Sequence, residues 1–318
     1  SQPMQEVYQV ILKAAASSAN VIIYGESGTG KELVAQTIHK LSDRSRRPFV
    51  PVNCGAIPEN LLESEFFGHK KGAFTGAHRD KPGFLAEADG GTLFLDEIGE
   101  INPNLQVKLL RAIEGGGYTP IGSSQVKQAD IRIVAATNLD LNQAVAEGRF
   151  RSDLFYRLNV FPIAIPPLRN RKADLPLLID YFITKTSKEY GLPFRFSDES
   201  MEILSNYDWP GNVRELENLI ERVAIMAETD QIEARMLPAY LFKQHTTPAC
   251  PSSDNDGCSQ LEIMEKEALL ASLARNEWIQ QKAAREIGLT LRQMGYRVKK
   301  YNLGGIIREN KKFQTLSS

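Results

Sequence analysis

The sequence predicts an α/β domain with a mainly parallel sheet, then a small helical domain, and finally a second all-helical domain at the C-terminus. Short β-branched or aromatic runs alternate with helical patterns as far as Pro166 and Pro167, which is typical of a parallel sheet covered by helices. Beyond these prolines the strand signals stop. A stretch rich in Pro, Ser, Thr, Asp and Gly at 243–260 then indicates a flexible linker.

The expected elements follow from local pattern. Strands are expected at 21–24, 48–52, 92–95 and 131–135, with helical patterns between them such as 32–41 and 105–114. In the helical domain, helices are expected at 173–190, 197–207 and 212–228. The break at Trp209-Pro210-Gly211 separates the last two. The predicted parts are therefore 1–168, 169–242, the linker 243–260, and 261–318.

Composition and charge exclude several classes of protein. The 318 residues are 42% hydrophobic and 24% charged, without an apolar run of the ~20 residues that a membrane-spanning helix needs. The first residues show no basic-then-apolar leader, and the three cysteines are too few for a disulfide scaffold, so we expect a cytoplasmic protein. The net charge of −1 divides into −6 over residues 1–258 and +5 over residues 259–318. This asymmetry is typical of an enzyme joined to a nucleic-acid-binding module.

A glycine-rich segment after the first expected strand has the pattern of a phosphate-binding loop. It comprises Gly25, Glu26, Ser27, Gly28, Thr29, Gly30 and Lys31, and a helix follows it. Glycines let the backbone turn its N–H groups toward phosphates, the helix N-terminus favours negative charge, and Lys31 would reach the β- and γ-phosphates. Glu32 replaces the Ser or Thr whose hydroxyl helps to hold Mg²⁺, so the metal must depend on other groups.

Two carboxylates follow the expected strand at 92–95. Asp96 and Glu97 would lie at the carboxyl end of a buried strand, where α/β sheets bind ligands. We expect Asp96 to hold Mg²⁺, directly or through water, and Glu97 to orient and polarise the attacking water. An Asp-Glu pair alone is usually a solvated turn, but together with the upstream loop it indicates a nucleotide hydrolase.

Two arginines, Arg151 and Arg157, are spaced six residues apart. In isolation such side chains form surface ion pairs. In a ring-forming ATPase they could instead reach a neighbour's γ-phosphate and stabilise the charge of the transition state. The spacing alone leaves both interpretations open.

A second glycine-rich segment carries one aromatic residue at its centre. Its residues are Gly72, Ala73, Phe74, Thr75, Gly76 and Ala77. A Phe on a mobile tip is costly to expose unless it meets a partner. The alternative is a turn whose Phe74 folds back into the core, and composition alone favours that alternative.

The C-terminal domain has the pattern of a helix-turn-helix. A helix is expected at 261–275, and helices at 280–287 and 291–301 flank a turn at 288–290. Met294 and Val298 would face inward. The residues expected to contact DNA are Thr290, Arg292, Gln293, Tyr296, Arg297, Lys299 and Lys300. The alternative is a helical hairpin with a solvated basic face.

Together these motifs resemble the bacterial enhancer-binding proteins, the AAA+ activators of sigma-54 RNA polymerase. The resemblance covers nearly all of residues 1–242. It rests on GESGTGKE (25–32), ESEFFGHKKGAFTGA (63–77), ADGGTLFLDEIGE (88–100), AATN (135–138), FRSDLFYRL (150–158) and WPGNVREL (209–216). The C-terminal domain is similar to the family's Fis-like helix-turn-helix, nearest to activators of nitrogen-fixation genes.

The resemblance implies a fold and a set of residue roles. The fold is an AAA+ P-loop ATPase with a helical lid subdomain, and Glu32 is the family's usual residue at the end of the phosphate loop. The segment 72–77 becomes the tip that touches sigma-54, which reverses the interpretation from composition. The other implied roles are trans-acting arginine fingers (Arg151, Arg157), a sensor arginine near the nucleotide (Arg214), a first sensor (Asn138 with Thr137) and a restraint on Glu97 (Asn53).

The implied function is ATP-driven activation of transcription by a ring, expected to be a hexamer, that uses ATP and Mg²⁺. Its partners would be sigma-54 RNA polymerase and double-stranded enhancer DNA, bound by dimeric C-terminal domains. One alternative is a DNA-binding repressor whose ATP site only controls assembly, although Glu97 and the complete 72–77 segment argue against it. Another is a general AAA+ remodeller of other proteins, against which sequence-specific DNA binding would count.

The resemblance also bears on the length of the protein. Members of this family usually carry an N-terminal sensing domain, so we expect the chain to be part of a longer protein, with a naturally short member as the alternative.

Two of the three cysteines lie in the linker. Cys250 and Cys258 are near His245, but their spacing and number do not suit a zinc site.

Overall fold

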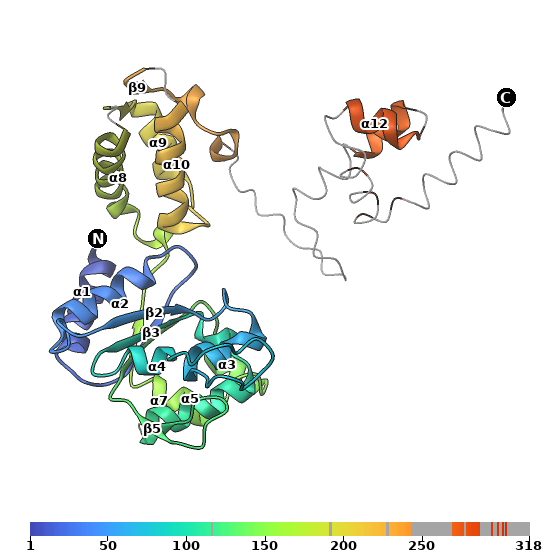
Figure 1. Ribbon diagram of the computed structural model, residues 1–318. Coiled ribbons are helices and arrows are strands. Elements are labelled where there is room, and N and C mark those ends of the chain that lie inside the picture. Colours follow the sequence, from blue (N-terminus) through green and yellow to red (C-terminus); the bar gives the residue numbers. More distant parts are fainter. Residues whose placement is uncertain are drawn as a thin grey trace. The chain divides into compact units, whose positions relative to one another are not determined.

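The computed structural model describes residues 1–115, 117–190, 193–226, 229–242, 269–276 and 278–286, and the single residues 294, 298, 301 and 303. The chain divides into two units, Ser1–His245 and Thr246–Ser318, whose elements are labelled in Figure 1. The linker 243–260 lies outside the described residues. None of the helices in the described ranges is both long enough and apolar enough to cross a membrane.

A five-stranded parallel sheet forms the centre of the first unit, as the sequence predicts. Its strands, in spatial order, are β2 (Phe49–Asn53), β3 (Thr92–Asp96), β6 (Arg132–Thr137), β1 (Val21–Tyr24) and β7 (Phe161–Ala164). The sequence pattern does not predict β7. This strand lies at the edge of the sheet and contains Pro162, which a central strand would not tolerate.

Helices cover both faces of the sheet because successive strand residues point to opposite sides (Figure 1). On one face, α1 (Gln2–Ala15) and α2 (Lys31–Leu41) pack against Val21 and Ile23. On the other face, Ile22 belongs to a larger core. That core is formed with α3 (Glu59–Phe67), α4 (Phe84–Glu87), α5 (Pro103–Gly115), α6 (Leu141–Ala146) and α7 (Ser152–Leu158).

Short elements complete this part of the chain. A two-stranded antiparallel sheet joins β4 (Gly117–Tyr118) to β5 (Lys127–Gln128). A single 3-10 turn, η1 (Ile98–Glu100), follows β3 and leads toward α5. The sheet and these helices therefore form the α/β layer that the sequence predicts.

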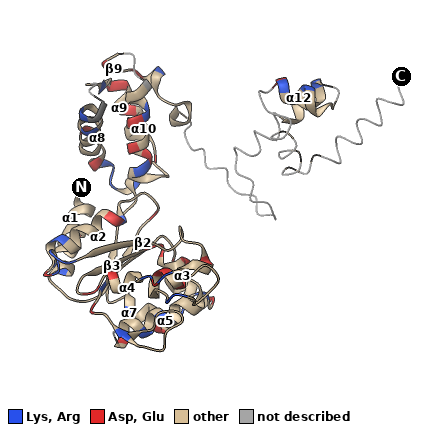
Figure 2. Cartoon of the chain, viewed as in Figure 1, with Lys and Arg blue, Asp and Glu red and all other residues tan. Residues whose placement is uncertain are grey.

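A helical subdomain, residues 168–242, follows the sheet. Its helices are α8 (Leu175–Tyr190), α9 (Asp198–Asn206) and α10 (Asn212–Met226), which match the expected pattern. The smaller elements are η2 (Leu168–Asn170), η3 (Lys172–Asp174), β8 (Arg195–Phe196), β9 (Gln231–Ile232), η4 (Ala234–Met236) and η5 (Ala239–Phe242). Charged residues of both signs lie along α8 and α10, whereas the charged residues of α9 are all acidic (Figure 2). The core surrounds Trp209, which is 0% exposed and donates its indole N–H to Leu204 O at 2.9 Å.

The second unit contains a helical stretch at 269–275 and α12 (Gln280–Glu286). Leu269, Leu273, Ala284, Met294 and Val298 are buried together. The inward orientation predicted for Met294 and Val298 is therefore confirmed. The expected DNA-contacting residues (Thr290, Arg292, Gln293, Tyr296, Arg297, Lys299 and Lys300) lie outside the described residues, as do Cys250 and Cys258.

Candidate nucleotide-binding site

The phosphate loop (residues 25–31) connects β1 to α2. Two of its glycines have left-handed backbone, with φ 77° at Gly28 and φ 100° at Gly30, which is the N-cap of α2. A Cβ added at Gly28 would lie 2.3 Å from the carbonyl oxygen of Gly211, whereas one added at Gly30 would meet no atom within 4 Å. The loop thus combines a glycine conformation, open space at Gly30 and a helix N-terminus, which together suit an anion.

Lys31 lies at the mouth of this loop. Its ammonium donates to Gly25 O at 2.8 Å and Glu26 O at 3.1 Å, and the residue is only 9% exposed. Burial lowers the pKa of Lys31, while the carboxylates of Asp96 and Glu97 oppose that effect. The side chain is therefore placed beside the loop and within the electrostatic influence of both carboxylates.

The carboxylates lie at the carboxyl end of β3, as predicted. Asp96 pairs in register with Asn53 of β2, and Glu97 follows it in left-handed backbone with φ 55°. The Glu97 carboxylate lies against Gly55, where an added Cβ would be 2.2 Å from Oε2. This backbone is costly for a residue with a Cβ, so the surrounding structure must hold Glu97 in place.

Asn53 is close to Glu97 but uses its side chain locally. Its Oδ1 accepts a hydrogen bond from the N–H of Ala56 at 2.9 Å. Within the described part of the chain no hydrogen bond joins Asn53 to Glu97. The expected restraint of Glu97 by Asn53 therefore stays a prediction.

A cleft of about 450 Å³ brings most of the predicted residues together. Those lining it are Ser27, Gly28, Gly30, Lys31, Glu32, Asn53, Asp96, Glu97, Asn138 and Arg214. Arg214 also donates to the Ser27 hydroxyl at 3.4 Å. Residues from the sheet domain and from the helical subdomain thus share one cleft.

Two predicted residues support the cleft rather than line it. Thr137 is fully buried; its carbonyl accepts from the Gly25 N–H at 3.2 Å and its hydroxyl from the Leu139 N–H at 3.0 Å. Glu26 turns its carboxylate toward Arg169, with contacts of 2.8 and 2.5 Å. Thr137 thus bonds the start of the phosphate loop, and Glu26 links the loop to Arg169 of η2.

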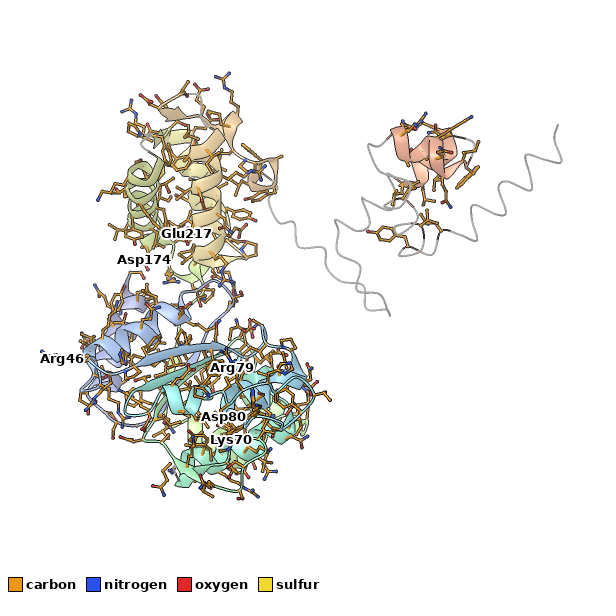
Figure 3. The ribbon with its side chains drawn as sticks, in the orientation of Figure 1. Arg46, Lys70, Arg79, Asp80, Asp174 and Glu217 are labelled. Carbon is orange, nitrogen blue, oxygen red and sulfur yellow. The ribbon has the colours of Figure 1, made fainter. Side chains whose placement is uncertain are left out.

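The sequence analysis missed the wall that the helical subdomain adds to the cleft. This wall comprises Leu178, Tyr181, Phe182, Lys185, Val213 and Glu217, with Leu33 of α2 beside them. Figure 3 labels Glu217. The spacing of the α8 residues at 178, 181, 182 and 185 follows a helical period, a signal that marks one face but not what that face covers.

The two predicted arginines lie outside the cleft. Arg151 precedes α7, where its backbone N–H donates to Gln106 Oε1 at 2.8 Å and its guanidinium contacts Asp153 at 3.0 and 2.6 Å. Arg157 lies exposed on α7. The Arg151–Asp153 pair is exposed to water, so breaking it costs little.

The GAFTGA loop (residues 72–77) lies between α3 and α4. A hydrogen bond of 2.8 Å from the Gly72 N–H to Ala77 O closes it, and both Gly72 and Gly76 have left-handed backbone with open space around them. Phe74 is 39% exposed and meets only the His69 ring edge-to-face at 4.9 Å among its aromatic neighbours in the described residues. The interpretation from composition, that Phe74 folds back into the core, is therefore wrong.

The base of the GAFTGA loop is firmly held. His69 and Lys81 exchange backbone hydrogen bonds of 3.0 Å, and the Lys70 ammonium contacts Asp80 at 2.6 Å (Figure 3). Asp80 also accepts from the Lys71 N–H at 2.8 Å, and Ile121 O accepts from the Lys70 N–H at 2.9 Å. An exposed tip thus stands on a paired base.

Comparison with known proteins identifies each part of the chain. Residues 1–164 match the Sigma-54 interaction domain, residues 169–253 the AAA+ ATPase lid domain, and residues 260–301 the bacterial regulatory proteins of the Fis family. The chain is 46% identical over 300 residues to a Nif-specific regulatory protein of Azotobacter vinelandii, covering 94% of this chain and 58% of that protein. Over 307 residues it is 47% identical to the response regulator protein PilR of Pseudomonas aeruginosa, covering 95% of this chain and 69% of that one.

Solved structures agree with these matches. NtrX from Brucella abortus in complex with ATP has a TM-score of 0.70 and 32% identity, covering 94% of this chain and 68% of that chain. The chain spans 58% of the length of the Azotobacter relative.

Proposed function

This chain belongs to the sigma-54-dependent transcriptional activators, and we propose that it hydrolyses ATP between subunits of a ring to remodel sigma-54 RNA polymerase. One observation carries the proposal. A single cleft holds the phosphate loop, both carboxylates and the arginine of the helical subdomain, while the GAFTGA loop remains exposed elsewhere on the same domain. A site for nucleotide chemistry and a separate contact surface are what a nucleotide-driven remodeller requires.

The cleft fits a nucleoside triphosphate. Gly30 leaves open space at the N-terminus of α2, Lys31 adds a cation at the loop, and the cleft of about 450 Å³ lies within the usual range for ligand pockets. Leu178 and Phe182 give one side of the cleft an apolar surface that suits a base. These features support ATP as the substrate.

The same cleft fits Mg²⁺ when phosphate is present. Asp96 is the residue that would hold it, and no cluster of three metal-ligating side chains occurs in the part of the chain that the structure describes. Mg²⁺ commonly takes one or two carboxylates and completes its coordination with phosphate oxygens and water. Bound there, the metal would neutralise charge on the phosphates.

Each residue of the site would then have its own role in hydrolysis. Glu97 orients a water and accepts its proton, while Lys31 and Arg214 stabilise phosphate charge. Arg151 and Arg157, which lie away from their own cleft, act on the cleft of the neighbouring subunit. We propose a ring on this basis, because the site of one subunit is complete only with arginines from the next; the resemblance to the family implies that the ring is a hexamer.

The GAFTGA loop would transmit the result to the polymerase. Its tip presents Phe74 and Thr75 on a base that is held by backbone pairing and by the Lys70–Asp80 ion pair. The basic C-terminal domain would hold the ring near the promoter by binding enhancer DNA.

Transcription in vitro from a sigma-54 promoter tests the proposal. Open complexes should form with ATP and not with a non-hydrolysable analogue. The Thr75→Ala variant should hydrolyse ATP at the wild-type rate and form no open complexes, because it removes one exposed side chain that does not line the cleft. Normal transcription by this variant would exclude the role of the loop, and activation without hydrolysis would exclude the role of ATP.

A further inference from the structure

The helical subdomain holds the phosphate loop through the backbone carbonyls of that loop. Three consecutive carbonyls accept hydrogen bonds from residues of this subdomain. The bonds run from Asn212 Nδ2 to Ser27 O, from the Val213 N–H to Gly28 O and from Arg171 Nη2 to Thr29 O, each at 3.0 Å. Because a peptide is planar and trans, its N–H points away from its C=O, so the bonds to Ser27 O and Thr29 O also fix the directions of the Gly28 and Gly30 N–H groups, whereas the Thr29 N–H donates to Glu26 O at 3.4 Å.

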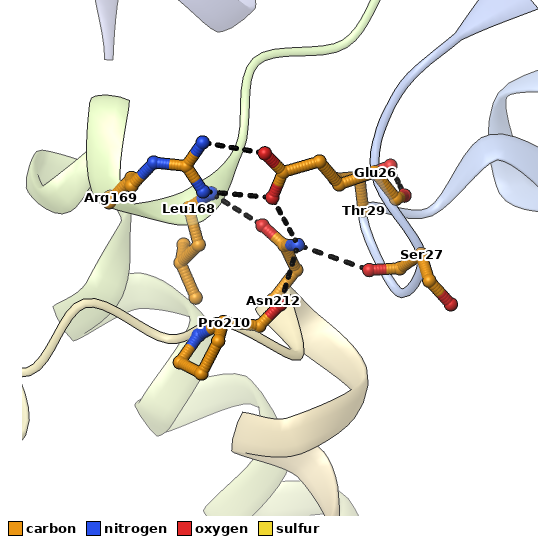
Figure 4. A network of polar contacts seen from close by, with 7 residues as sticks. All are labelled: Glu26, Ser27, Thr29, Leu168, Arg169, Pro210 and Asn212. Atoms are coloured by element: carbon orange, nitrogen blue, oxygen red, sulfur yellow. Dashed lines mark hydrogen bonds and ion pairs between the residues drawn. The ribbon is translucent and has the colours of Figure 1, made fainter. Parts of the chain in front are cut away.

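Asn212 is the centre of this arrangement (Figure 4). Its Nδ2 donates to Ser27 O and to Glu26 Oε2 at 3.1 Å, and its Oδ1 accepts from the Leu168 N–H at 2.8 Å. The residue is 0% exposed and has left-handed backbone with φ 55°, a conformation that Asn tolerates better than most residues. One buried carboxamide thus joins the phosphate loop, the connection at 166–174 and the start of α10.

Glu26 is the charged partner in this network. Its carboxylate accepts hydrogen bonds from both terminal guanidinium nitrogens of Arg169 and from Asn212 Nδ2. The hydrogen bond from Arg169 lowers the pKa of Glu26, and the one from Asn212 adds to that effect. The Glu26–Arg169 pair is about two-fifths exposed and is worth little by itself. The hydrogen bonds of the buried Asn212 side chain are therefore the part of the network that can determine the shape of the loop.

We propose that Asn212, with Glu26 as its partner, is a positioning residue for nucleotide binding. Asn212 holds the phosphate loop in the conformation that binds phosphate, so the loop does not have to reorganise when the nucleotide binds. A hydrogen bond on a carbonyl also polarises the N–H of the same peptide and makes it a better donor. The proposal rests on the proposed function. It predicts an effect on nucleotide affinity and on the KM for ATP rather than on kcat, because Asn212 lies behind the loop.

The Asn212→Asp variant tests this directly. Aspartate has the same shape, tolerates the same backbone and keeps the acceptor for the Leu168 N–H. It loses the donor to Ser27 O and places a second carboxylate beside Glu26. We expect ADP affinity to fall, and the KM for ATP to rise, by about tenfold to a hundredfold, with kcat within about threefold of wild type.

A matched control lies in the same subdomain. Asn206 is exposed at the end of α9, and Asn206→Asp adds the same charge without touching the phosphate loop. Its ADP affinity should equal that of the wild type.

A double variant tests whether the pair can be exchanged. The variant Glu26→Gln combined with Asn212→Asp exchanges the carboxylate and the carboxamide, and should bind ADP more tightly than Asn212→Asp alone.

Calorimetry with ADP separates this proposal from the proposed function, because it requires no hydrolysis. Failure of the wild type to hydrolyse ATP would refute the proposed function and leave the ADP comparison decisive for Asn212. Unchanged ADP affinity in Asn212→Asp, a fall in kcat at constant KM, or an exchange variant no better than Asn212→Asp would each overturn the inference. Should Asn212→Asp not fold, Asn212→Gly decides, because glycine tolerates the left-handed backbone and removes the donor to Ser27 O: weaker ADP binding supports the inference and wild-type binding overturns it.

Discussion

Replacing Gly28 with alanine tests how closely the helical subdomain approaches the phosphate loop. The new methyl group would lie 2.3 Å from Gly211 O and 3.0 Å from the Cβ of Arg214. The backbone of Gly28, with φ 77°, adds about 1–2 kcal/mol for any residue with a Cβ. Forcing a methyl group into a filled space adds about 1–3 kcal/mol. The total destabilisation of about 2–5 kcal/mol would weaken the contact between the loop and the helical subdomain.

Gly148 supplies the matched control for this substitution. Its φ is 73°, yet a Cβ there would meet nothing within 4 Å. Gly148→Ala should therefore cost only the backbone part, about 1–2 kcal/mol. Thermal unfolding of both variants and calorimetry with ADP measure the difference: Gly28→Ala should have the lower midpoint and the weaker ADP binding. Equal midpoints and equal ADP affinity in the two variants would refute the close approach of Gly211 to Gly28.

Three further predictions concern hydrolysis, the core and alkaline pH. Glu97→Gln should bind ATP normally but lower kcat by about a hundredfold or more in a steady-state ATPase assay, because the amide cannot accept the proton of water. Trp209→Ala should lower the free energy of unfolding by about 3–5 kcal/mol, measured by denaturant titration, since it empties a fully buried site. Burial, with Glu215 nearby, raises the pKa of Tyr207 to about 12. Between about pH 10 and 12 the Tyr207 hydroxyl therefore stays protonated in the folded state but ionises in the unfolded state. The free energy of unfolding should fall over this range, and it should fall less in Tyr207→Phe.

Controls and contrary results are specific to each of these variants. Exposed Glu100→Gln should leave kcat unchanged, and wild-type turnover by Glu97→Gln would remove Glu97 from the chemistry. Phe242→Ala, at a side chain that is 50% exposed, should cost far less than Trp209→Ala, and equal losses would contradict the core described. An identical alkaline loss in the wild type and Tyr207→Phe would show that other groups cause it.

Local pattern predicted the parts of the molecule whose structure depends on near neighbours. The phosphate loop, the strand before Asp96 and the helices of the helical subdomain all carry short-range signals, and the structure has them at the expected positions. Strand β7 was missed because Pro162 argues against a strand unless its place at the sheet edge is known. Phe74 was misjudged by composition, since hydrophobicity alone does not tell which side of a turn a ring occupies.

The missed parts of the site depend on tertiary structure. Leu178 and Phe182 line the cleft because α8 and the phosphate loop border the same space, and the spacing of residues within α8 does not show this. Asn212 reaches Ser27 across 185 residues of sequence, and it does so from a left-handed backbone that follows the Trp209-Pro210-Gly211 break. The sequence located that break but gave no sign of the contact it makes.

The contact between Gly211 and Gly28 limits how the two parts of the ATPase can move. A Cβ on Gly28 would lie 2.3 Å from Gly211 O, so the two backbones approach too closely for a side chain to stand between them. The hydrogen bonds to Ser27 O, Gly28 O and Thr29 O lie beside this contact, so the loop and the helical subdomain are joined at several points rather than at one hinge. A shift of the phosphate loop would therefore be passed directly to the start of α10, whose Val213 N–H is bonded to Gly28 O.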